Sequence, residues 1–332
     1  MSLLRIGLIG YGKWTRNAYL PALKRDGRAV ITSVAAKSES TREMISRDLG
    51  SNVSIFEGFE SLLEGSELDA VFIGVPDFLH ESAIRAVLDT GLPALYEPPV
   101  SDKRENMLPM IQRLLEAPQI THANIELCYN PVVGRAAELM RKNALGTMQT
   151  ANINLQSSWG PKPGFEISNI NHMSAWYVDI LNRILGAAPS RVMMFDGHGV
   201  SGKRQSHSSA YYDYNGVWGH IKANIASVGE LDMRVELSGD DGDIVINMVS
   251  GELRIRTRNN PDWTVEEWPA ILPHADLPGT HESISAFIDA VESGKPTAAN
   301  PRNVASLHLT GLAADNSRDS GTWANIPDVS TL

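Results

Sequence analysis

The chain has 332 residues, of which 42% are apolar and 20% charged, and this length corresponds to about two domains of a globular protein. A net charge of −10 argues against broad nucleic-acid binding, and the single cysteine, Cys128, excludes a disulfide framework and a multi-cysteine metal site. No apolar run approaches the roughly 20 residues of a membrane span, and the chain begins with a predicted strand, so we expect a cytoplasmic protein without membrane association or signal peptide.

The first third of the chain alternates predicted strands and helices. Near-continuous apolar runs predict buried strands at residues 4–9, 30–36, 53–56, 69–75, 94–96 and 119–125. Helices are expected between them, at residues 17–26, 40–48, 61–64, 80–90 and 106–116. This alternation predicts a parallel sheet with helices on both faces.

After about Gln149 the apolar pattern changes to period two. The alternating segments are residues 147–156, 218–226, 233–237, 244–248 and 253–257. They predict an open, mostly antiparallel sheet, with a tight turn at "GDDGD" and helices at residues 177–185 and 280–292. We therefore expect an α/β protein with one domain at residues 1–126 and a second at 127–332, whose late helix packs back on the first.

A glycine pair lies in the first strand-to-helix turn. Gly10 allows a tight turn, and Gly12 lets the backbone approach a pyrophosphate at a helix N-terminus. The third position of this fingerprint is Thr15 rather than glycine or alanine. A purely structural turn is the alternative, but its place in the first strand-to-helix turn favours a dinucleotide-binding Rossmann domain.

The end of the second predicted strand bears on the choice of cofactor. An Asp or Glu here would bind the free 2′-hydroxyl of NAD, but the strand ends in Lys37 and Ser38. A lysine and a hydroxyl suit a 2′-phosphate better, so NADP is favoured and NAD stays possible. Lys37 could also be an ordinary solvated loop residue.

Three stretches carry a resemblance to a known family. They are "LRIGLIGYGKWTRNAYLPAL", "LDAVFIGVPDFLHESAIRAVLDTGLPALYEPP" and "DILNRILG". The sequence resembles the Gfo/Idh/MocA oxidoreductases, which include glucose–fructose oxidoreductase and inositol dehydrogenase. The resemblance implies a Rossmann domain followed by an α/β domain with an open, mostly antiparallel sheet. It also implies hydride transfer between a nicotinamide and a sugar, a cyclitol or a derivative.

The resemblance also implies roles for individual residues. Along the pyrophosphate it places Gly10, Gly12, Lys13 and Trp14. Along the adenosine–ribose side it places Val75, Pro76 and His80, although His80 could be only a helix N-terminal residue. Near the nicotinamide ribose it places Glu97 and its neighbour Pro98.

The chain departs from the family pattern where the chemistry takes place. The family has Glu-Lys-Pro where this chain has Glu97-Pro98-Pro99, and a proline side chain can neither donate nor accept a proton. The family also has an Asp and a His where alignment on Asp179 gives His172 and Trp176. We therefore expect altered catalytic residues.

Replacement groups are available in the second domain. His172 is the leading candidate acid/base because imidazole titrates near neutral pH, and Tyr177 and Tyr129 are further candidates. Trp159 and Trp176 could line a substrate pocket. Each of these residues could instead have a structural role. No metal site is expected, because the spacing of His198 and His207 matches none of the common ones.

Two main functions remain open, beside a weaker third, a redox-cycling hydrolase or lyase that keeps its nicotinamide bound. The first is an NAD(P)-dependent oxidoreductase acting on a small sugar-like, cyclitol or other carbonyl or imine substrate, with the proton supplied by His172 and not by the Glu97-Pro98-Pro99 segment. The second is a sensor or regulatory protein of the same fold that binds NADP and a ligand without turnover. In both cases we expect a homodimer or homotetramer formed through the C-terminal sheet.

Overall fold

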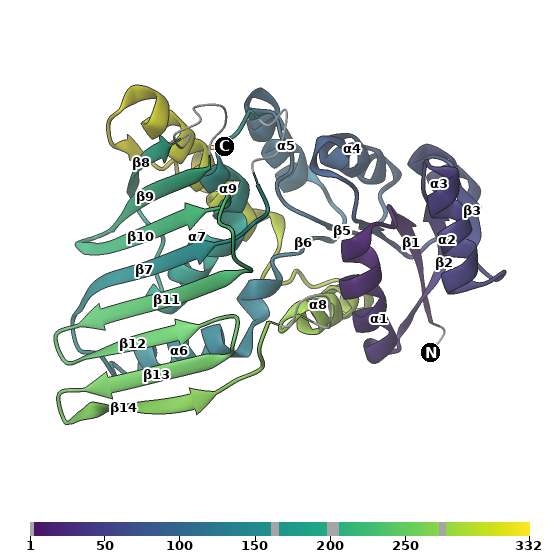
Figure 1. Ribbon diagram of the computed structural model, residues 1–332. Coiled ribbons are helices and arrows are strands. Elements are labelled where there is room, and N and C mark those ends of the chain that lie inside the picture. The colour runs from purple at the N-terminus through teal and green to yellow at the C-terminus, as the bar shows by residue number, and fades with distance from the viewer. Residues whose placement is uncertain (1–2, 161–165, 198–205, 272–276) are drawn as a thin grey trace. The chain divides into compact units, whose positions relative to one another are not determined.

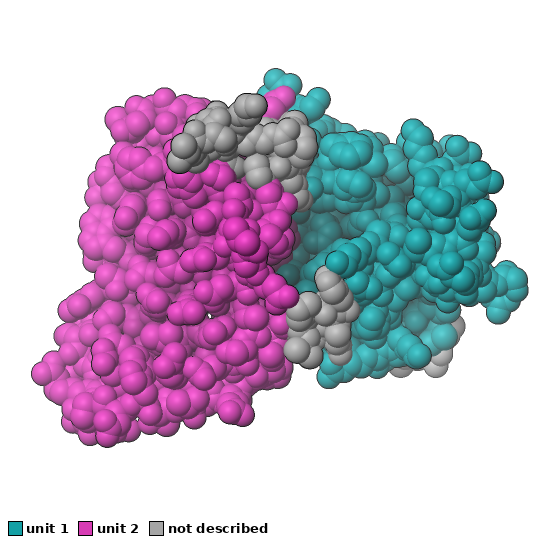
Figure 2. Space-filling model, in the orientation of Figure 1, with its two compact units in different colours: residues 1–126, 273–305 teal, residues 127–272, 306–332 magenta. Residues whose placement is uncertain are grey.

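The computed structural model describes residues 3–160, 166–197, 206–271 and 277–332. The chain forms two compact units, coloured separately in Figure 2. Unit 1 comprises Met1–Glu126 and Pro273–Ala305, and unit 2 comprises Leu127–Leu272 and Ser306–Leu332. The first segment of unit 1 ends at Glu126, and residues 277–305 also belong to this unit.

Unit 1 is built on a six-stranded parallel sheet (Figure 1). In spatial order its strands are β3 (Ser54–Phe56), β2 (Ala29–Ala35), β1 (Leu4–Ile9), β4 (Ala70–Ile73), β5 (Ala94–Tyr96) and β6 (Thr121–Ala123). This strand order is that of a Rossmann sheet, in which ligands bind at the carboxyl ends of the central strands. The predicted parallel sheet is confirmed.

Helices follow the strands of unit 1, each close to its predicted position. They are η1 (Thr15–Tyr19), α1 (Leu20–Asp26), α2 (Glu39–Leu49), α3 (Phe59–Gly65), η2 (Asp77–Leu79), α4 (His80–Thr90) and α5 (Arg104–Glu116). The late helix α8 (Thr280–Ser293) packs in the same core. Its Phe287 meets Phe72 of β4 edge to face, with ring centroids 5.5 Å apart.

Unit 2 contains a nine-stranded sheet. In spatial order its strands are β14 (Asn260–Glu267), β13 (Glu252–Thr257), β12 (Gly242–Asn247), β11 (Asp232–Gly239), β7 (Met148–Gln156), β10 (Val217–Asn224), β9 (His207–Tyr214), β8 (Arg191–Gly197) and β15 (Ala324–Asn325). Its pairs are antiparallel except β7 with β10. The predicted open, mostly antiparallel sheet is confirmed, and "GDDGD" turns between β11 and β12.

Helices cover one face of this second sheet. α6 (Pro131–Arg141), α7 (Asn169–Leu185) and α9 (Pro301–Ser320) lie behind the strands in Figure 1. Along each central strand, the buried residues alternate with more exposed ones, as expected for a sheet covered on one side. Among the described residues, no helix covers the opposite face.

The sequence interpretation was wrong about several elements of unit 2. Helix α7 begins at Asn169 rather than Tyr177, because the Ser168 side chain caps it by accepting a hydrogen bond from the backbone N–H of Asn171 (3.1 Å). His172 and Trp176 therefore lie within the helix. Also unpredicted were α6, α9, β8, β9 and β14. His207 begins β9, whereas His198 lies outside the described residues.

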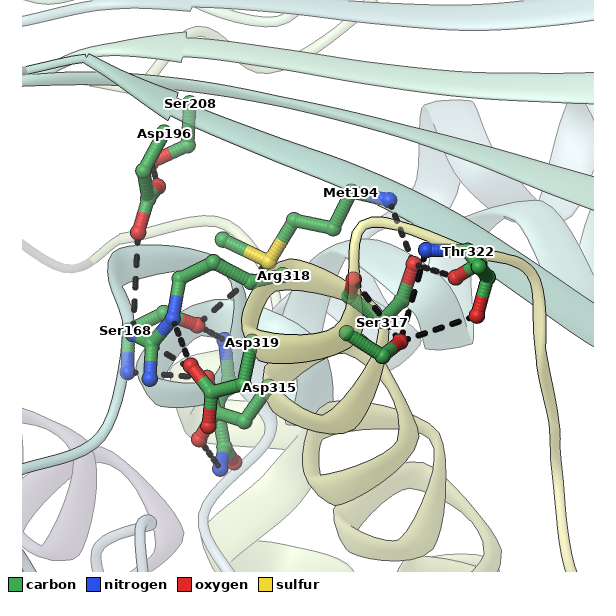
Figure 3. Close-up of polar contacts among 11 residues, drawn as sticks. Ser168, Met194, Asp196, Ser208, Asp315, Ser317, Arg318, Asp319 and Thr322 are labelled. Atoms are coloured by element: carbon green, nitrogen blue, oxygen red, sulfur yellow. Dashed lines mark hydrogen bonds and ion pairs between the residues drawn. The ribbon is translucent and has the colours of Figure 1, made fainter.

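A cluster of buried polar side chains stabilises the packing of the C-terminal end of α9 within unit 2 (Figure 3). The fully buried Asp315 carboxylate accepts hydrogen bonds from the Ser168 backbone N–H (3.1 Å) and from Asn171 Nδ2 (2.7 Å). Arg318 Nη1 lies between two carboxylates, 3.7 Å from Asp315 and 3.6 Å from Asp196. These contacts join the helix to α7 and β8.

Candidate active site in the Rossmann unit

The glycine turn after β1 has a backbone that only glycine adopts easily. Gly10 has a φ of 97°, and a Cβ atom there would lie 2.4 Å from the carbonyl oxygen of Gly74. A Cβ on Gly12 would meet no atom within 4 Å, so space remains open in front of this residue. A continuous helix starts directly after it, at Lys13. An open backbone at a helix N-terminus fits a dinucleotide pyrophosphate.

Thr15 replaces the third glycine of the fingerprint without closing the turn. Its side chain is buried, and its Oγ1 donates to the Gly10 carbonyl oxygen (3.3 Å). Space for it is provided by Gly74 at the end of β4, where a Cβ would lie 2.7 Å from Thr15 Oγ1. A second glycine therefore maintains the close approach of helix and strand.

The end of β2 carries two cationic side chains rather than an acidic one. Lys37 and Ser38 are exposed, and Ser38 caps α2 by accepting from the Thr41 backbone N–H (3.2 Å). Arg42, which the sequence analysis missed, donates through Nη1 to the carbonyl oxygens of Ala36 (3.2 Å) and Lys37 (2.6 Å). The only feature of the sequence that pointed to Arg42 as a cofactor-binding residue was its position one turn into α2.

His80 joins two loops of the site rather than facing solvent. Its side chain is buried, and its ring nitrogens contact two backbone carbonyl oxygens, Nδ1 that of Pro99 (2.7 Å) and Nε2 that of Val75 (3.0 Å). This geometry supports a positioning role, in which His80 holds the loop after β4 against the loop after β5. Val75 is half-buried and Pro76 exposed at the same edge.

Glu97, at the end of β5, is the most strongly perturbed carboxyl group of the site. Its Oε1 accepts hydrogen bonds from Trp14 Nε1 (2.7 Å), Asn124 Nδ2 (2.8 Å) and the Tyr19 hydroxyl. Burial and then the nearby charge of Glu126 raise the pKa of Glu97 to about 8, against a smaller opposing effect of these hydrogen bonds. Burial and the charge of Glu126 thus favour the protonated form of Glu97. Tyr19, Asn124 and Glu126 were all missed by the sequence analysis.

A chain of hydrogen bonds continues from Glu97 into the core of unit 1. The Ser283 hydroxyl of α8 donates to Asn124 Oδ1 (2.9 Å) and also contacts His122 Nε2 (2.9 Å). His122 Nδ1 contacts Thr297 Oγ1 (2.9 Å). Burial lowers the pKa of His122 to about 3, so this imidazole is neutral. The network fixes the orientation of the Asn124 amide that holds Glu97.

The other candidate residues lie in unit 2. His172 and Trp176 are half-exposed on otherwise buried turns of α7, with ring centroids 6.3 Å apart. Asp179 and Arg183 continue this stripe and form an ion pair (2.5 Å). Burial raises the pKa of Asp179. Tyr129 interacts electrostatically with Arg183.

Two aromatic candidates differ sharply in burial. Tyr177 lies on the buried side of α7 with 5% of its surface exposed, whereas Trp159 is 58% exposed. The structure thus gathers the predicted cofactor residues at the carboxyl ends of β1, β2, β4 and β5. It groups His172 with Trp176 and sets Tyr177 on another side of the same helix.

Two further properties concern the described part of the chain. Within it, no group of three or more His, Cys, Asp or Glu side chains could hold a metal ion. None of its helices is both long and apolar enough to cross a membrane.

Comparisons with known proteins agree with this arrangement. Residues 4–124 match a family model described as an oxidoreductase family with an NAD-binding Rossmann fold. The chain is 23% identical over 147 residues to a dTDP-3,4-didehydro-2,6-dideoxy-alpha-D-glucose 3-reductase of Actinomadura kijaniata, covering 44% of each chain. It is 25% identical over 137 residues to a D-xylose 1-dehydrogenase (NADP(+)) of Haloferax volcanii, covering 41% of this chain and 42% of the relative. The match thus spans less than half the length of these relatives.

Solved structures extend the similarity to the whole fold. An Agrobacterium radiobacter oxidoreductase in complex with NAD+, L-tartaric acid and magnesium has a TM-score of 0.82, 17% identity and full coverage of both chains. A levoglucosan dehydrogenase in complex with NADH and L-sorbose has a TM-score of 0.81 and 17% identity, covering 99% of this chain and all of that one. Residues 4–124 thus match the Gfo/Idh/MocA oxidoreductase family model, with its NAD-binding Rossmann fold, and the whole chain shares the fold of these solved oxidoreductases.

Proposed function

We propose that this protein is an NAD(P)-dependent oxidoreductase that transfers hydride between a nicotinamide and a small sugar-like, cyclitol or other carbonyl or imine substrate. The observation that carries the proposal is the contact of Trp14 Nε1, directly after the glycine turn, with Glu97 at the end of β5 (2.7 Å). It joins the pyrophosphate and nicotinamide ends of a Rossmann site. The sugar chemistry of the relatives supports the substrate class.

The cofactor would be held by groups of unit 1. Gly10 and Gly12 leave the backbone open to the pyrophosphate, and His80 positions the loops after β4 and β5. When bound, a nicotinamide supplies or accepts the hydride. Lys37 and Arg42 place two cations where NAD-specific sites carry an acidic group, so we propose that NADP binds more tightly than NAD.

Calorimetric titration with both cofactors tests this part of the proposal. Gly12→Val should abolish binding of both cofactors without loss of stability, because a side chain there meets no protein atom within 4 Å. Gly134→Val, whose position in α6 is equally open, is the matched control.

Lys37→Ala and Arg42→Ala should weaken the binding of NADP more than that of NAD, whereas Arg47→Ala, later on α2, should change neither. Tighter NAD binding by the wild type would contradict the NADP preference.

Within unit 2, the half-exposed stripe of α7 is a candidate surface for a substrate. His172 and Trp176 offer an imidazole and an aromatic surface side by side, which suits a polar ring. A screen of sugars, cyclitols, keto-sugars and cyclic imines by NADPH absorbance tests for turnover.

One observation favours a second candidate, a non-catalytic sensor of NADP and a ligand. Pro98 is buried and carries no group that could transfer a proton in place of the family lysine. Tight cofactor binding without turnover on any substrate class would favour this function over the first.

A further inference from the structure

We propose that Glu97 is the proton-transfer group of this protein, holding its proton on Oε2 and exchanging it with the reacting oxygen or nitrogen of the substrate. The inference rests on the proposed oxidoreductase function and deepens it. It gives to Glu97 the role that the sequence analysis assigned to His172.

The hydrogen bonds at Oε1 show which oxygen carries the proton. The indole N–H of Trp14 (2.7 Å) and the amide N–H of Asn124 (2.8 Å) can only donate, and both point at Oε1, as does the Tyr19 hydroxyl. An oxygen that already accepts from such groups is a poor place for a further proton. The proton of the acid form therefore lies on Oε2.

The core behind Glu97 reinforces this assignment. Because neutral His122 has a single ring N–H, the consistent arrangement is Thr297 donating to its Nδ1, its Nε2–H donating to Ser283, and Ser283 donating to Asn124. Every hydrogen bond in the chain then runs toward Glu97. Two of the three groups at Oε1, Trp14 Nε1 and Asn124 Nδ2, can only donate, and the Tyr19 hydroxyl is the one group there that could accept.

Oε2 is free to exchange its proton. It has no hydrogen-bond partner among the described residues, and the Glu97 residue is half-buried. The neighbouring Pro98 supplies neither a competing proton nor a positive charge that would favour the carboxylate. Burial and the charge of Glu126 raise the pKa of Glu97 to about 8, so the acid form predominates at neutral pH.

The proton balance of the reaction is simple. When a carbonyl is reduced, its carbon gains the hydride, the O–H bond at Glu97 Oε2 breaks, and a new O–H bond forms on the substrate oxygen. Glu97 is left as a carboxylate, which Trp14, Asn124 and Tyr19 stabilise through Oε1 until water returns a proton to Oε2. In the oxidising direction, the carboxylate accepts the substrate hydroxyl proton.

Two measurements test the inference, and the first needs neither cofactor nor substrate. The infrared carbonyl band of a protonated carboxyl group, taken as wild type minus Glu97→Gln, should be present at neutral pH and disappear with a midpoint near pH 8. A midpoint near the ordinary value of 4.5 would overturn the assignment.

The second measurement is turnover across pH. Gln keeps an acceptor oxygen toward the three donors but cannot transfer a proton, so Glu97→Gln should bind cofactor as the wild type does and lose about 10²–10⁴ in kcat. Wild-type reduction should slow as pH rises through about 8, and the variant should lack this alkaline limb. His172→Ala should act mainly on KM.

The outcomes separate this inference from the proposed function. Full kcat in Glu97→Gln, together with its loss in His172→Ala, would overturn the role of Glu97 and leave an oxidoreductase. A wild type that binds cofactor, shows the infrared midpoint near pH 8 and turns over no substrate class would overturn the oxidoreductase function itself.

Discussion

At the residue scale, the replacement of one side chain changes the chemistry available to its neighbour. The sequence shows that Pro98 cannot act as the family lysine does, and this was predicted. It does not show that the pKa of Glu97 is raised, because the groups around this carboxyl come from distant segments. Tyr19 and Trp14, whose hydrogen bonds lower the pKa, follow β1. Asn124, which also lowers it, and Glu126, whose charge raises it, follow β6. Only the fold brings these groups together.

Because the pKa of Glu97 depends on the groups around it, a charged side chain at position 98 should change it. An ammonium group beside Glu97 should favour the carboxylate and lower the pKa of Glu97 from about 8 to between about 5 and 7, so at most about half of the Glu97 side chains would hold a proton at neutral pH. The change is measured as the pH midpoint of the infrared carbonyl band in the difference spectrum of Pro98→Lys minus Pro98→Lys/Glu97→Gln. An unchanged midpoint would show that the ammonium does not reach the carboxyl.

At the element scale, two of the helices that were missed or shortened, α7 and α9, were difficult to predict for different reasons. The start of α7 depends on the Ser168 cap, which follows a segment without clear apolar periodicity. Helix α9 is buried on most sides along its middle turns, with Ala, Gly, Ser, Thr and His among the buried residues, so it presents no apolar stripe to recognise. The strands that were predicted in both sheets lie, by contrast, within a few residues of their expected positions.

The polar cluster of Figure 3 predicts what holds α9 in unit 2. Asp315→Ala should lower the free energy of unfolding of unit 2 by about 3–5 kcal/mol. The substitution leaves the buried N–H donors of Ser168 and Asn171 without their acceptor and removes the ion-pair partner of Arg318. Asp319→Ala breaks a more exposed ion pair with the same arginine and should cost less than about 1 kcal/mol. Urea unfolding measures both, and equal losses would contradict the role of Asp315.

At the scale of the whole molecule, the buried groups of unit 1 predict how stability depends on pH. His122 has a pKa of about 3 in the fold and 6.5 ordinarily, so stability is lost as pH falls below about 6.5. Glu97 has a pKa of about 8 in the fold and 4.5 ordinarily, so the stability from its bound proton is lost as pH rises from about 4.5 to 8. The two effects oppose each other between about 4.5 and 6.5, and above 6.5 Glu97 acts alone.

The expected loss of unfolding free energy from pH 6.5 to 8 is about 2 kcal/mol for the wild type. Glu97→Gln should remove this loss, because its amide does not titrate. Urea unfolding at several pH values measures the slope. Parallel slopes for the wild type and the variant would assign the loss to other groups.

The uncovered face of the nine-stranded sheet predicts self-association. Phe195 on β8, Tyr211 on β9 and Trp218 on β10 keep 41–52% of their surface exposed at positions that alternate with buried ones. Phe195→Asp should reduce the mass measured by light scattering at micromolar concentration, whereas Val228→Asp, at an exposed position outside the strands, should not. A monomeric wild type would contradict the proposal.

Hydride transfer by this protein can be tested by following the transferred atom from cofactor to product. A single turnover with NADPH deuterated at nicotinamide C4, followed by mass spectrometry of the product, reports whether the transferred atom comes from the cofactor. We predict deuterium on the former carbonyl or imine carbon in the wild type, and a slowed appearance of the same labelled product in Glu97→Gln. Product without deuterium from cofactor labelled on either face of the ring, or no product from any substrate class, would contradict the claim.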